Sequence, residues 1–343
     1  MTKMMDALPF PRVSLANIPT PLELLENLRR RVGGPKLLVK RDDNTGLAMG
    51  GNKVRQLEFY LGEAVANGAD TVIATGAVQS NHVRVTAAAA ARLGLKCIVQ
   101  LENRVPNMKP EYAVSGNVLL DELFGAEIHR FPVGEDEEAA DASMYKVAAE
   151  CSRQGGKPYV IPNSVNHKPL GALGYVLAAR ELHHQLEAMK ESAGAIVLAS
   201  GGANTHAGLL VGLRMLSQHT RVYGFCVRRN SRKQRERVWK RVTMLAEMMG
   251  VPELVGEGDV WVSDEFLGPG YGQLDARSLE TLRVVAQAEG LLLDPVYTAK
   301  AMSGLLELVK QGHFRSDETV VFLHTGGTPA LFGYGELIRE RRE

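Results

Sequence analysis

A lysine that follows a pair of glycines is the first residue in this chain whose type and position suit chemistry. Gly50, Gly51 and Asn52 precede Lys53, and the apolar pattern of a helix follows it. At a helix N-terminus the helix dipole disfavours the protonated form of a lysine and favours the neutral, nucleophilic amine. The glycines permit a bound group to approach the backbone closely. A tight turn with a solvated lysine accounts equally well for this stretch alone.

A polar turn after a predicted strand offers a place for a carboxylate. Ser80, Asn81 and His82 follow a run of small and β-branched residues at positions 71–75. Ligands of parallel α/β sheets collect at the carboxyl ends of strands, and the N–H groups at the start of a helix bind anions. Ordinary helix capping by Ser80 or Asn81, with a His82 that only packs, is the simpler alternative.

A third turn, made of small residues, offers a place for a phosphate. It follows the apolar run at 195–199 and contains Gly201, Gly202, Ala203, Asn204 and Thr205. Several backbone N–H groups in such a loop can surround a phosphate. The loop lacks the lysine and the spacing of a P-loop, which disfavours nucleoside triphosphates but allows a phosphate monoester. A plain strand-to-helix turn is an equal alternative.

Polar residues near the C-terminus complete the set. Tyr271 lies between two glycines, Tyr297 follows an Asp-Pro-Val sequence, and Thr325 ends a predicted strand before a glycine turn. Each tyrosine could equally be a core residue whose hydroxyl has a partner. Taken together, a lysine nucleophile, a phosphate loop and a carboxylate site suit pyridoxal phosphate, whose aldehyde needs a lysine and whose phosphate needs a cup.

The elements that must position these residues alternate between short strands and longer helices. This rhythm predicts parallel sheets covered by helices, with right-handed crossovers. The predicted strands are residues 36–40, 71–75, 97–101, 159–161, 195–199, 222–227 and 319–323. The predicted helices include residues 53–66, 82–93, 139–151 and 171–186. A Thr-Pro-Leu-Glu sequence at residues 20–23 has the capping hydroxyl, the first-turn proline and the glutamate that are typical of a helix start.

Composition places the chain among ordinary globular proteins. It has 343 residues, of which 45% are hydrophobic and 23% are charged, and its formal net charge is +1. No stretch approaches the roughly 20 apolar residues of a membrane helix, and so small a net charge predicts no nucleic-acid partner. Three cysteines without metal-ligand spacing, and an N-terminus without the pattern of a signal peptide, predict a cytoplasmic protein that holds no metal.

One stretch, residues 228–241, is strongly basic. It contains Arg228, Arg229, Arg232, Arg237 and Arg241 among other cations. We interpret it as the solvated face of a helix. The alternative is that one or two of its arginines face an anionic substrate or a subunit interface. Few aromatic residues accompany the arginines, so nucleic-acid binding is disfavoured here too.

Several longer motifs follow one another over nearly the whole chain. They are Gly50-Gly51-Asn52-Lys53, Gln79-Ser80-Asn81-His82, Gly171-Ala172-Leu173-Gly174-Tyr175, Leu292-Leu293-Asp294-Pro295-Val296-Tyr297 and His324-Thr325-Gly326-Gly327. In type and order these motifs resemble the aminocyclopropane-carboxylate deaminase / D-cysteine desulfhydrase family, which includes L-cysteate sulfo-lyase. The resemblance extends from about residue 10 to about residue 334.

The resemblance implies a fold, a cofactor and an assembly. The fold would be the α/β fold of the tryptophan synthase β subunit, which is fold type II among pyridoxal phosphate enzymes. A larger cofactor domain with a parallel sheet would comprise residues 1–50 and 160–343, and a smaller inserted α/β domain residues 51–159. The substrate would be a small amino acid, and two identical chains would form a homodimer.

The resemblance also implies roles for the candidate residues. Lys53 would bind the aldehyde of the cofactor and then remove the Cα proton of the substrate. The residues that bind the cofactor would be Lys53, Asn81, Gly201, Gly202, Ala203, Asn204, Thr205 and Thr325. The residues that bind the substrate would be Ser80, Asn81, His82, Asn163, Tyr271 and Tyr297. Those with a catalytic role would be Lys53, Ser80, Tyr271 and Tyr297.

Two positions separate the branches of the family. The deaminases that open the cyclopropane ring carry Glu after the second tyrosine and Leu before the Gly-Gly pair, where this chain has Thr298 and Thr325. This departure favours β-elimination of a sulfur group. We therefore expect first a D-cysteine desulfhydrase that yields pyruvate, ammonia and sulfide. The alternative is an L-cysteate sulfo-lyase that yields sulfite instead of sulfide, and ring opening or a non-catalytic homologue ranks below both.

Two further departures concern loops. Residues 163–169 replace a glycine-rich segment of the relatives, and His167 and Lys168 could contact an anionic leaving group such as sulfonate. An exposed loop explains Lys168 equally well. Asn204 stands where relatives usually have Gly or Ser, and a phosphate cup made of backbone tolerates it if its φ is negative.

Overall fold

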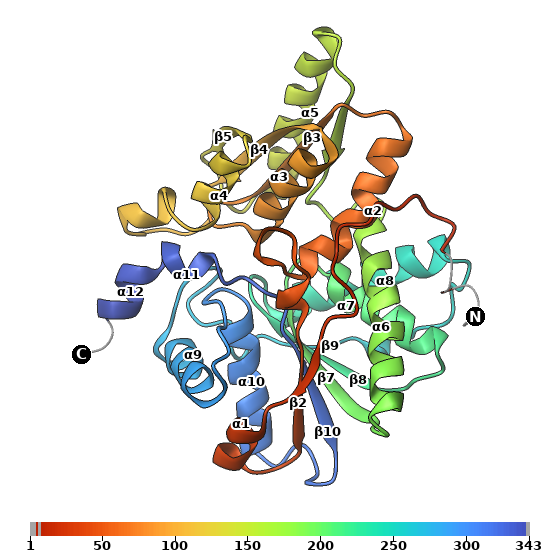
Figure 1. Cartoon of the computed structure of the whole chain (residues 1–343), viewed down its shortest axis with the longest axis vertical. Helices are drawn as coiled ribbons and strands as arrows, with labels where there is room; N and C mark the ends of the chain where they lie inside the picture. Colours follow the sequence, from red (N-terminus) through yellow and green to blue (C-terminus); the bar gives the residue numbers. More distant parts are fainter. Residues whose placement is uncertain (1–4, 6–7, 341–343) are drawn as a thin grey trace.

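Two sheets form the framework of the computed structural model, which describes residue 5 and residues 8–340 (Figure 1). The larger sheet has the strand order β1-β2-β10-β7-β8-β9. β1 pairs antiparallel with β2, and the other neighbouring pairs are parallel. The strands of this sheet are β1 (Leu22–Leu24), β2 (Lys36–Lys40), β7 (Ala193–Ser200), β8 (Arg221–Cys226), β9 (Trp261–Ser263) and β10 (Thr319–Leu323).

The smaller sheet lies in the upper part of Figure 1 and is parallel throughout. Its order is β5-β4-β3-β6. The strands are β3 (Thr71–Ala77), β4 (Lys96–Glu102), β5 (Glu127–Phe131) and β6 (Pro158–Ile161). The helices that accompany it are α3 (Asn81–Leu93), α4 (Asn117–Leu123) and α5 (Glu137–Arg153).

Alternate residues of the larger sheet pack against opposite layers of helices. Leu38 and Val321 belong to the core on one face, whereas Leu37 and Val320 belong to the core on the other. The helices of the first face are α2 (Asn52–Ala66), α6 (Leu170–Ala188), α7 (Asn204–Met215) and α8 (Ser231–Met248). Those of the second are α1 (Glu26–Val32), α9 (Ala276–Glu289) and α10 (Thr298–Lys310). Because both faces are covered, a central strand such as β10 is apolar along nearly its whole length.

Short helices connect these elements. They are η2 (Asp42–Asn44), η3 (Leu47–Met49), η4 (Pro110–Ala113), η5 (Glu257–Asp259), α11 (Ala330–Gly333) and α12 (Gly335–Glu340). In the part of the chain that the structure describes, none of the helices is long and apolar enough to cross a membrane.

The predicted strands and helices are confirmed in position, with one error near the N-terminus. The helix start predicted at residues 20–23 is wrong, because this stretch leads into β1, which pairs with the edge of β2, and α1 begins at Glu26 instead. The Thr20 hydroxyl donates to Asp42 Oδ1 at 2.8 Å rather than capping a helix. Tertiary contacts therefore outweigh the local capping pattern at this position.

The two sheets meet with the carboxyl ends of their strands near one another. The turns after β3, β7 and β10 all contribute to a cavity there. The strands of the smaller sheet lie within residues 71–161, and those of the larger sheet lie on either side of that stretch. The division into domains at about residues 50 and 160 stays a prediction.

Candidate active site

The residues that the sequence predicts for the site line one cavity between the two sheets. They are Lys53, Ser80, Asn81, His82, Asn163, Gly201, Gly202, Ala203, Asn204, Thr205, Tyr271, Tyr297 and Thr325. They come from stretches that are far apart in the sequence. The carboxyl ends of parallel strands bring them together, as expected for an α/β fold.

A hydrogen-bonded turn places Lys53 in the first turn of α2. The Gly51 N–H donates to Thr45 Oγ1 at 2.8 Å, and the Thr45 hydroxyl donates to the Gly51 carbonyl at 2.9 Å. The Asn52 N–H donates to the Thr325 carbonyl at 3.0 Å. Gly51 has a φ of 114°, which a side chain would strain. The glycine thus serves a turn that ties Lys53 to the end of β10.

The Lys53 amine has few partners. Burial, and to a smaller extent the charge of Arg237, lowers its pKa to about 8. Among the described residues its Nζ atom has one hydrogen-bond partner, Gln56 Oε1 at 3.3 Å. Burial also lowers the pKa values of Lys40 and Lys300, but Lys40 donates to three oxygens and Lys300 to two backbone carbonyls. Neither of these two lysines lines the cavity, so Lys53 is the one placed to react there.

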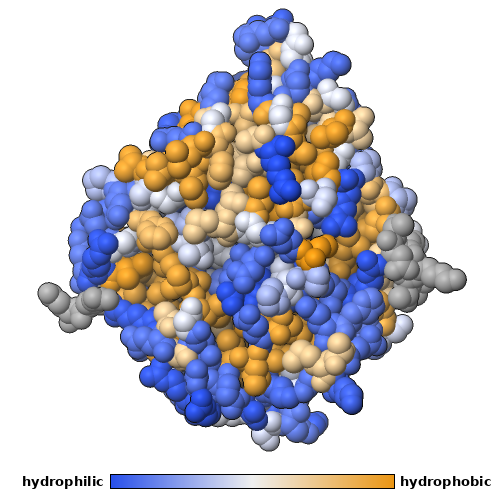
Figure 2. Space-filling model, in the orientation of Figure 1, coloured by the Kyte–Doolittle hydropathy of each residue, from blue (hydrophilic) through white to orange (hydrophobic). Residues whose placement is uncertain are grey.

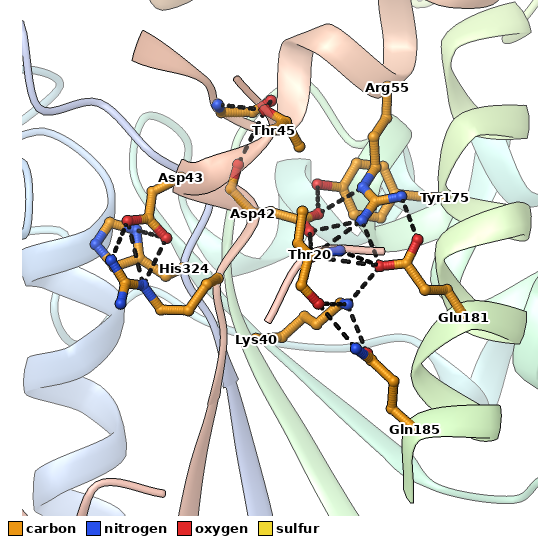
Figure 3. A network of polar contacts seen from close by, with 12 residues as sticks. Thr20, Lys40, Asp42, Asp43, Thr45, Arg55, Tyr175, Glu181, Gln185 and His324 are labelled. Carbon is orange, nitrogen blue, oxygen red and sulfur yellow. Dashed lines mark hydrogen bonds and ion pairs between the residues drawn. The ribbon is translucent and has the colours of Figure 1, made fainter. Parts of the chain in front are cut away.

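A buried network of charges supports the turn from below α2 (Figure 3). Arg55 Nε and Nη2 donate to the two oxygens of Asp42 at 3.0 and 2.9 Å, and the Tyr175 hydroxyl donates to the same carboxylate at 2.6 Å. Glu181 accepts from Arg55 and from Lys40. Burial, the largest single cause, raises the pKa of Asp42, but the charge and hydrogen bonds of Arg55, together with Lys40 and Tyr175, outweigh it and hold that pKa below its usual range. The network joins η2, α2 and α6 around the segment that carries Lys53.

The predicted phosphate loop leads from β7 into α7. Ala203 has a φ of 75°, whereas Asn204, the first residue of α7, has no positive φ, so the condition for tolerating an asparagine there is met. A Cβ added at Gly202 would meet nothing within 4 Å, so the loop borders open space. The Thr205 hydroxyl accepts from Asn52 Nδ2 at 2.9 Å. First-turn N–H groups of a helix lack partners within the helix, and here they face a loop with room for an anion.

The turn after β3 both caps a helix and lines the cavity. Ser80 Oγ accepts a hydrogen bond from the Val83 N–H at 3.3 Å, so the capping alternative is confirmed for this residue. Arg84 Nη1 donates to Asn81 Oδ1 at 2.7 Å, which engages the amide oxygen and leaves the amide nitrogen as a donor. Burial, followed by the charge of the nearby lysine, lowers the pKa of His82 to about 3, so its imidazole is neutral at pH 7.

Two tyrosines and a buried aspartate form another wall. The hydroxyl oxygens of Tyr271 and Tyr297 lie 2.6 Å apart. Asp294 accepts from the backbone N–H groups of Val296, Tyr297 and Thr298, and from the Thr298 hydroxyl at 2.7 Å. Thr298 is fully buried and lies outside the lining of the cavity. This threonine therefore orders the loop that carries Tyr297 and has no direct place beside a substrate.

Our interpretation of residues 228–241 as a solvated helix face is wrong for most of the arginines named there. Arg228, Arg229 and Arg241 line the cavity and Arg237 is buried beside them, whereas Arg232 is exposed. The buried residues of α8 are Gln234, Arg237, Val238, Arg241, Val242, Leu245 and Ala246. Their spacing of three and four is that of a buried helix face, and this signal in the sequence could have identified two of the arginines.

Two lining residues carry no signal in the sequence. Arg104 follows β4, and Glu137 is the first residue of α5. Both belong to the segments that accompany the smaller sheet, and only the folded chain brings them opposite Arg228. In the loop at residues 163–169, His167 lines the cavity, while Lys168 is exposed as the alternative interpretation expects.

Comparison with known proteins assigns the chain to a family. The family described as "Pyridoxal-phosphate dependent enzyme" matches residues 13–326. The chain belongs to this family. It is 43% identical over 325 residues to a D-cysteine desulfhydrase of Salmonella paratyphi A, a match that covers 95% of this chain and 96% of that protein.

Solved structures of other proteins have a similar fold. A structure described as an ACC deaminase homologue is 37% identical, has a TM-score of 0.85, and covers 97% of this chain and 96% of its own. A diaminopropionate ammonia lyase of Escherichia coli is 17% identical with a TM-score of 0.66, covers 95% of this chain and 87% of its own, and shows the fold alone. The resemblance seen in the sequence and the fold type II class are therefore confirmed.

The pyridoxal phosphate on which this family depends fits the residues present. The cavity holds an amine with a lowered pKa, and a loop with open space beside it leads into a helix N-terminus. Asn204 Oδ1 is buried there without a partner among the described residues. Lys53 would hold the aldehyde and residues 201–205 the phosphate, and these residue roles stay predictions.

The pKa of Lys53 predicts how cofactor capture depends on pH. A neutral amine attacks the aldehyde, and a pKa lowered to about 8 makes the neutral form predominate from pH 8 upward. We expect the rate constant for capture by the cofactor-free protein to rise about tenfold per pH unit below this pKa and to level off above it. Stopped-flow absorbance measures this rate constant. A rate that still rises through the ordinary range of a lysine would contradict the placement of Lys53.

A methyl group at Gly326 tests how the turn depends on β10. Gly326 has a φ of 88°, and a Cβ there would lie 2.7 Å from Gly51 Cα. We expect Gly326→Ala to displace the Lys53 turn and to weaken cofactor binding by about tenfold or more, as titrated by absorbance. Gly312→Ala is the matched control, because Gly312 has a φ of 69° and nothing within 4 Å. Equal losses in the two variants would mean that the contact with Gly51 is unimportant.

Proposed function

We propose that this chain is a pyridoxal phosphate-dependent β-elimination lyase that removes a sulfur group from Cβ of a small amino acid. D-Cysteine is the first candidate substrate, and pyruvate, ammonia and sulfide are the expected products. The observation that carries the proposal is the placement of a nearly unpartnered lysine amine in one cavity with the phosphate loop and the turn at Ser80 and Asn81. The name of the Salmonella relative supports the choice of substrate.

Each wall of the cavity has a part in this proposal. When bound, pyridoxal phosphate withdraws electrons from the Cα atom of the amino acid attached to it. The Lys53 amine is neutral above about pH 8 and accepts the Cα proton. Ser80 and the N–H groups of Asn81 and His82 hold the substrate carboxylate, and Tyr271 and Tyr297 flank the substrate.

Thr325 would influence how soon the group on Cβ leaves after the Cα proton is removed. Its hydroxyl would face the pyridine nitrogen of the cofactor, where a hydroxyl cannot keep that nitrogen protonated as a carboxylate would. Negative charge on Cα is then less stabilised, which favours prompt departure of the group on Cβ. The overall reaction balances, because D-cysteine and one water give pyruvate, ammonia and hydrogen sulfide.

L-Cysteate is the second candidate substrate, and the arginines favour it. Arg228, Arg229 and Arg241 line the cavity and outnumber Glu135 and Glu137, the two carboxylates that pair with any of them, so an anionic substituent on Cβ would be attracted there. L-Cysteate and one water would give pyruvate, ammonia and sulfite. Opening of a cyclopropane ring is the weaker candidate, because Thr298 is engaged with Asp294 and supplies no acid at the site.

Pyruvate release tests the proposal. We expect the holoenzyme to form pyruvate from D-cysteine, L-cysteate or β-chloroalanine, and not from aminocyclopropane carboxylate. Lactate dehydrogenase coupled to NADH oxidation measures the product. If none of the β-substituted amino acids yields pyruvate, the elimination function is wrong, and a cofactor-binding protein without this activity takes its place.

We also propose a homodimer in the cytoplasm. Val114, Leu123 and Phe332 are large exposed apolar residues on neighbouring segments around η4, α4 and α11, and apolar surface gathers over this region (Figure 2). Apolar surface of this kind suits an interface between subunits. The free cysteines Cys97, Cys151 and Cys226 suit a reducing compartment. Light scattering after size-exclusion chromatography measures the assembly, and a monomeric holoenzyme at micromolar concentration would contradict it.

A further inference from the structure

One carboxylate holds three arginines at the wall of the cavity. Glu137 accepts hydrogen bonds from Arg228 Nη1 at 2.6 Å, Arg229 Nη2 at 2.5 Å and Arg237 Nη1 at 2.8 Å. None of these four side chains is more than 17% exposed. Charges in such surroundings are costly unless an opposite charge offsets them. Three guanidinium groups around one carboxylate therefore leave an excess of positive charge.

The neighbouring carboxylates do not cancel this excess. Glu135 accepts from Arg228 Nε at 3.0 Å, but its side chain is 64% exposed, and solvent weakens such a pair. Glu102 accepts from Arg104 Nε and Nη2 at 2.8 and 2.7 Å and is thereby engaged. The Nε atom of Arg237 is buried and has no partner among the residues that the structure describes. The arginines around Glu137 therefore carry positive charge that the neighbouring carboxylates do not offset, and Arg237 Nε is an available hydrogen-bond donor.

Arg241 lies on another side of the cavity. It donates to the carbonyls of Ser164 and His167 at 3.0 and 2.7 Å. His167 lies 3.2 Å from the Tyr60 hydroxyl, which accepts from Asn204 Nδ2 at 3.2 Å. These contacts link Arg241 through His167 and Tyr60 to Asn204 of the predicted phosphate loop, and a phosphate bound by that loop would offset part of the charge of Arg241. Of the arginines around Glu137, Arg229 also contacts this loop, whereas no hydrogen bond among the described residues joins Arg228 or Arg237 to it.

Two of the arginines around Glu137 contact the backbone of segments that line the cavity. Arg237 Nη2 donates to the Asn163 carbonyl at 2.8 Å, and Arg229 Nη1 donates to the Gly201 carbonyl at 3.4 Å. Asn163 and Gly201 both line the cavity. The charge of Arg237 also reaches Lys53, where it is the second cause of the lowered pKa. An anion bound here would therefore lie close to the amine that accepts the Cα proton.

We propose that Arg228, Arg229 and Arg237, held together by Glu137, form a subsite for an anionic group on Cβ of the substrate. The substrate class that fits is a small amino acid with a second negative charge, such as a sulfonate, whose oxygens suit the paired donors of a guanidinium. The inference rests on the proposed β-elimination and predicts that an acid with a sulfonate on Cβ binds more tightly than the same acid without it. Glu137 is a positioning residue, because it offsets the repulsion between the arginines.

The subsite assists the bond that breaks. The Cα proton passes to the Lys53 amine, and its electron pair forms the Cα–Cβ double bond. The electron pair of the C–S bond leaves with sulfur, so the sulfonate departs as sulfite with one more negative charge. Cations at this position stabilise the charge that develops on the leaving group. Water then replaces nitrogen at Cα, which yields pyruvate and ammonia.

Binding of two unreactive acids tests the subsite without turnover. 3-Sulfopropanoate has the carboxylate and sulfonate of L-cysteate but no amine, and propanoate lacks the sulfonate. By calorimetry with the holoenzyme we expect 3-sulfopropanoate to bind about 10- to 100-fold more tightly, and Arg228→Gln to remove most of this difference. Arg232→Gln is the matched control, because Arg232 lies four residues after Arg228, at the start of α8, and its side chain is 76% exposed.

Turnover provides the second readout. We expect the kcat/KM for L-cysteate relative to that for β-chloroalanine to fall about 10- to 100-fold in Arg228→Gln and to recover partly in Arg228→Lys, which keeps the charge. Equal falls for both substrates, or equal binding of the two acids by the wild type, would overturn the subsite. If 3-sulfopropanoate binds as expected but no substrate yields pyruvate, the subsite stands and the proposed function fails. If D-cysteine yields pyruvate but 3-sulfopropanoate and propanoate bind equally, the proposed function stands and the subsite fails.

Discussion

Lys53→Ala is expected to give a folded protein without the visible absorbance of bound cofactor and with pyruvate release slower by about 10³-fold or more. The loss is large because one side chain supplies both the covalent attachment of the cofactor and the base for the Cα proton. Lys53 is the one lysine among the described residues that line the cavity. Absorbance spectra of the purified protein and the pyruvate assay measure the two effects.

A second variant of Lys53 separates the reactivity of its amine from the charge and size of the side chain, and a variant of another lysine is the control. Lys53→Arg keeps a cation of similar length but no amine that can attack an aldehyde, so we expect it to be as inactive as Lys53→Ala. Lys146→Ala removes an exposed lysine of α5 and should leave both measurements unchanged. Added methylamine should restore part of the turnover of Lys53→Ala. Full activity in Lys53→Arg would remove Lys53 from the mechanism.

Arg55→Ala is expected to lower the free energy of unfolding by about 3–5 kcal/mol. Arg55 is 3% exposed, and its removal leaves Asp42 and Glu181 with the single cation Lys40. Buried carboxylates that lose a partner are costly, and the network joins the segment that carries Lys53 to α6 (Figure 3). Urea unfolding followed by circular dichroism measures the loss. We expect cofactor occupancy to fall in the same variant.

The control for Arg55 is an arginine whose ion pair is exposed to solvent. Arg315 pairs with Asp317, and both side chains are largely exposed, so Arg315→Ala should have no measurable effect on unfolding. If Arg55→Ala unfolds at the same urea concentration as the wild type, the buried network does not support the fold in the way its contacts indicate.

Much of the fold was predictable because local pattern and tertiary packing agree. The apolar runs of β2 and β10 begin and end where the sequence predicts. β1 and β9 are short edge strands of three residues, and so brief a pattern gives no signal of its own. The wrong helix start at residues 20–23 has a different cause, since the hydroxyl of Thr20 is used by Asp42, which no local rule takes into account.

The candidate site was predictable where a residue type is tied to a turn. Ser80 and Gly201 follow the ends of β3 and β7, and Lys53 in the first turn of α2 is tied to the end of β10, so the fold brings the three together. Glu137 was not predictable, because it caps no turn and its role depends on arginines that are about 90 residues or more away. The same holds for Thr298, whose contact with Asp294 shows that a position typical of a family branch need not touch a substrate.

Reduction of the holoenzyme with borohydride, followed by peptide mapping, tests the central claim most directly. Reduction fixes the cofactor to the amine that holds it, and mass spectrometry of the peptides identifies that amine. We predict the pyridoxyl group on Lys53 and on no other residue. A group on Lys40 or Lys300, the other buried lysines with lowered pKa values, or no labelled peptide at all, would contradict the account.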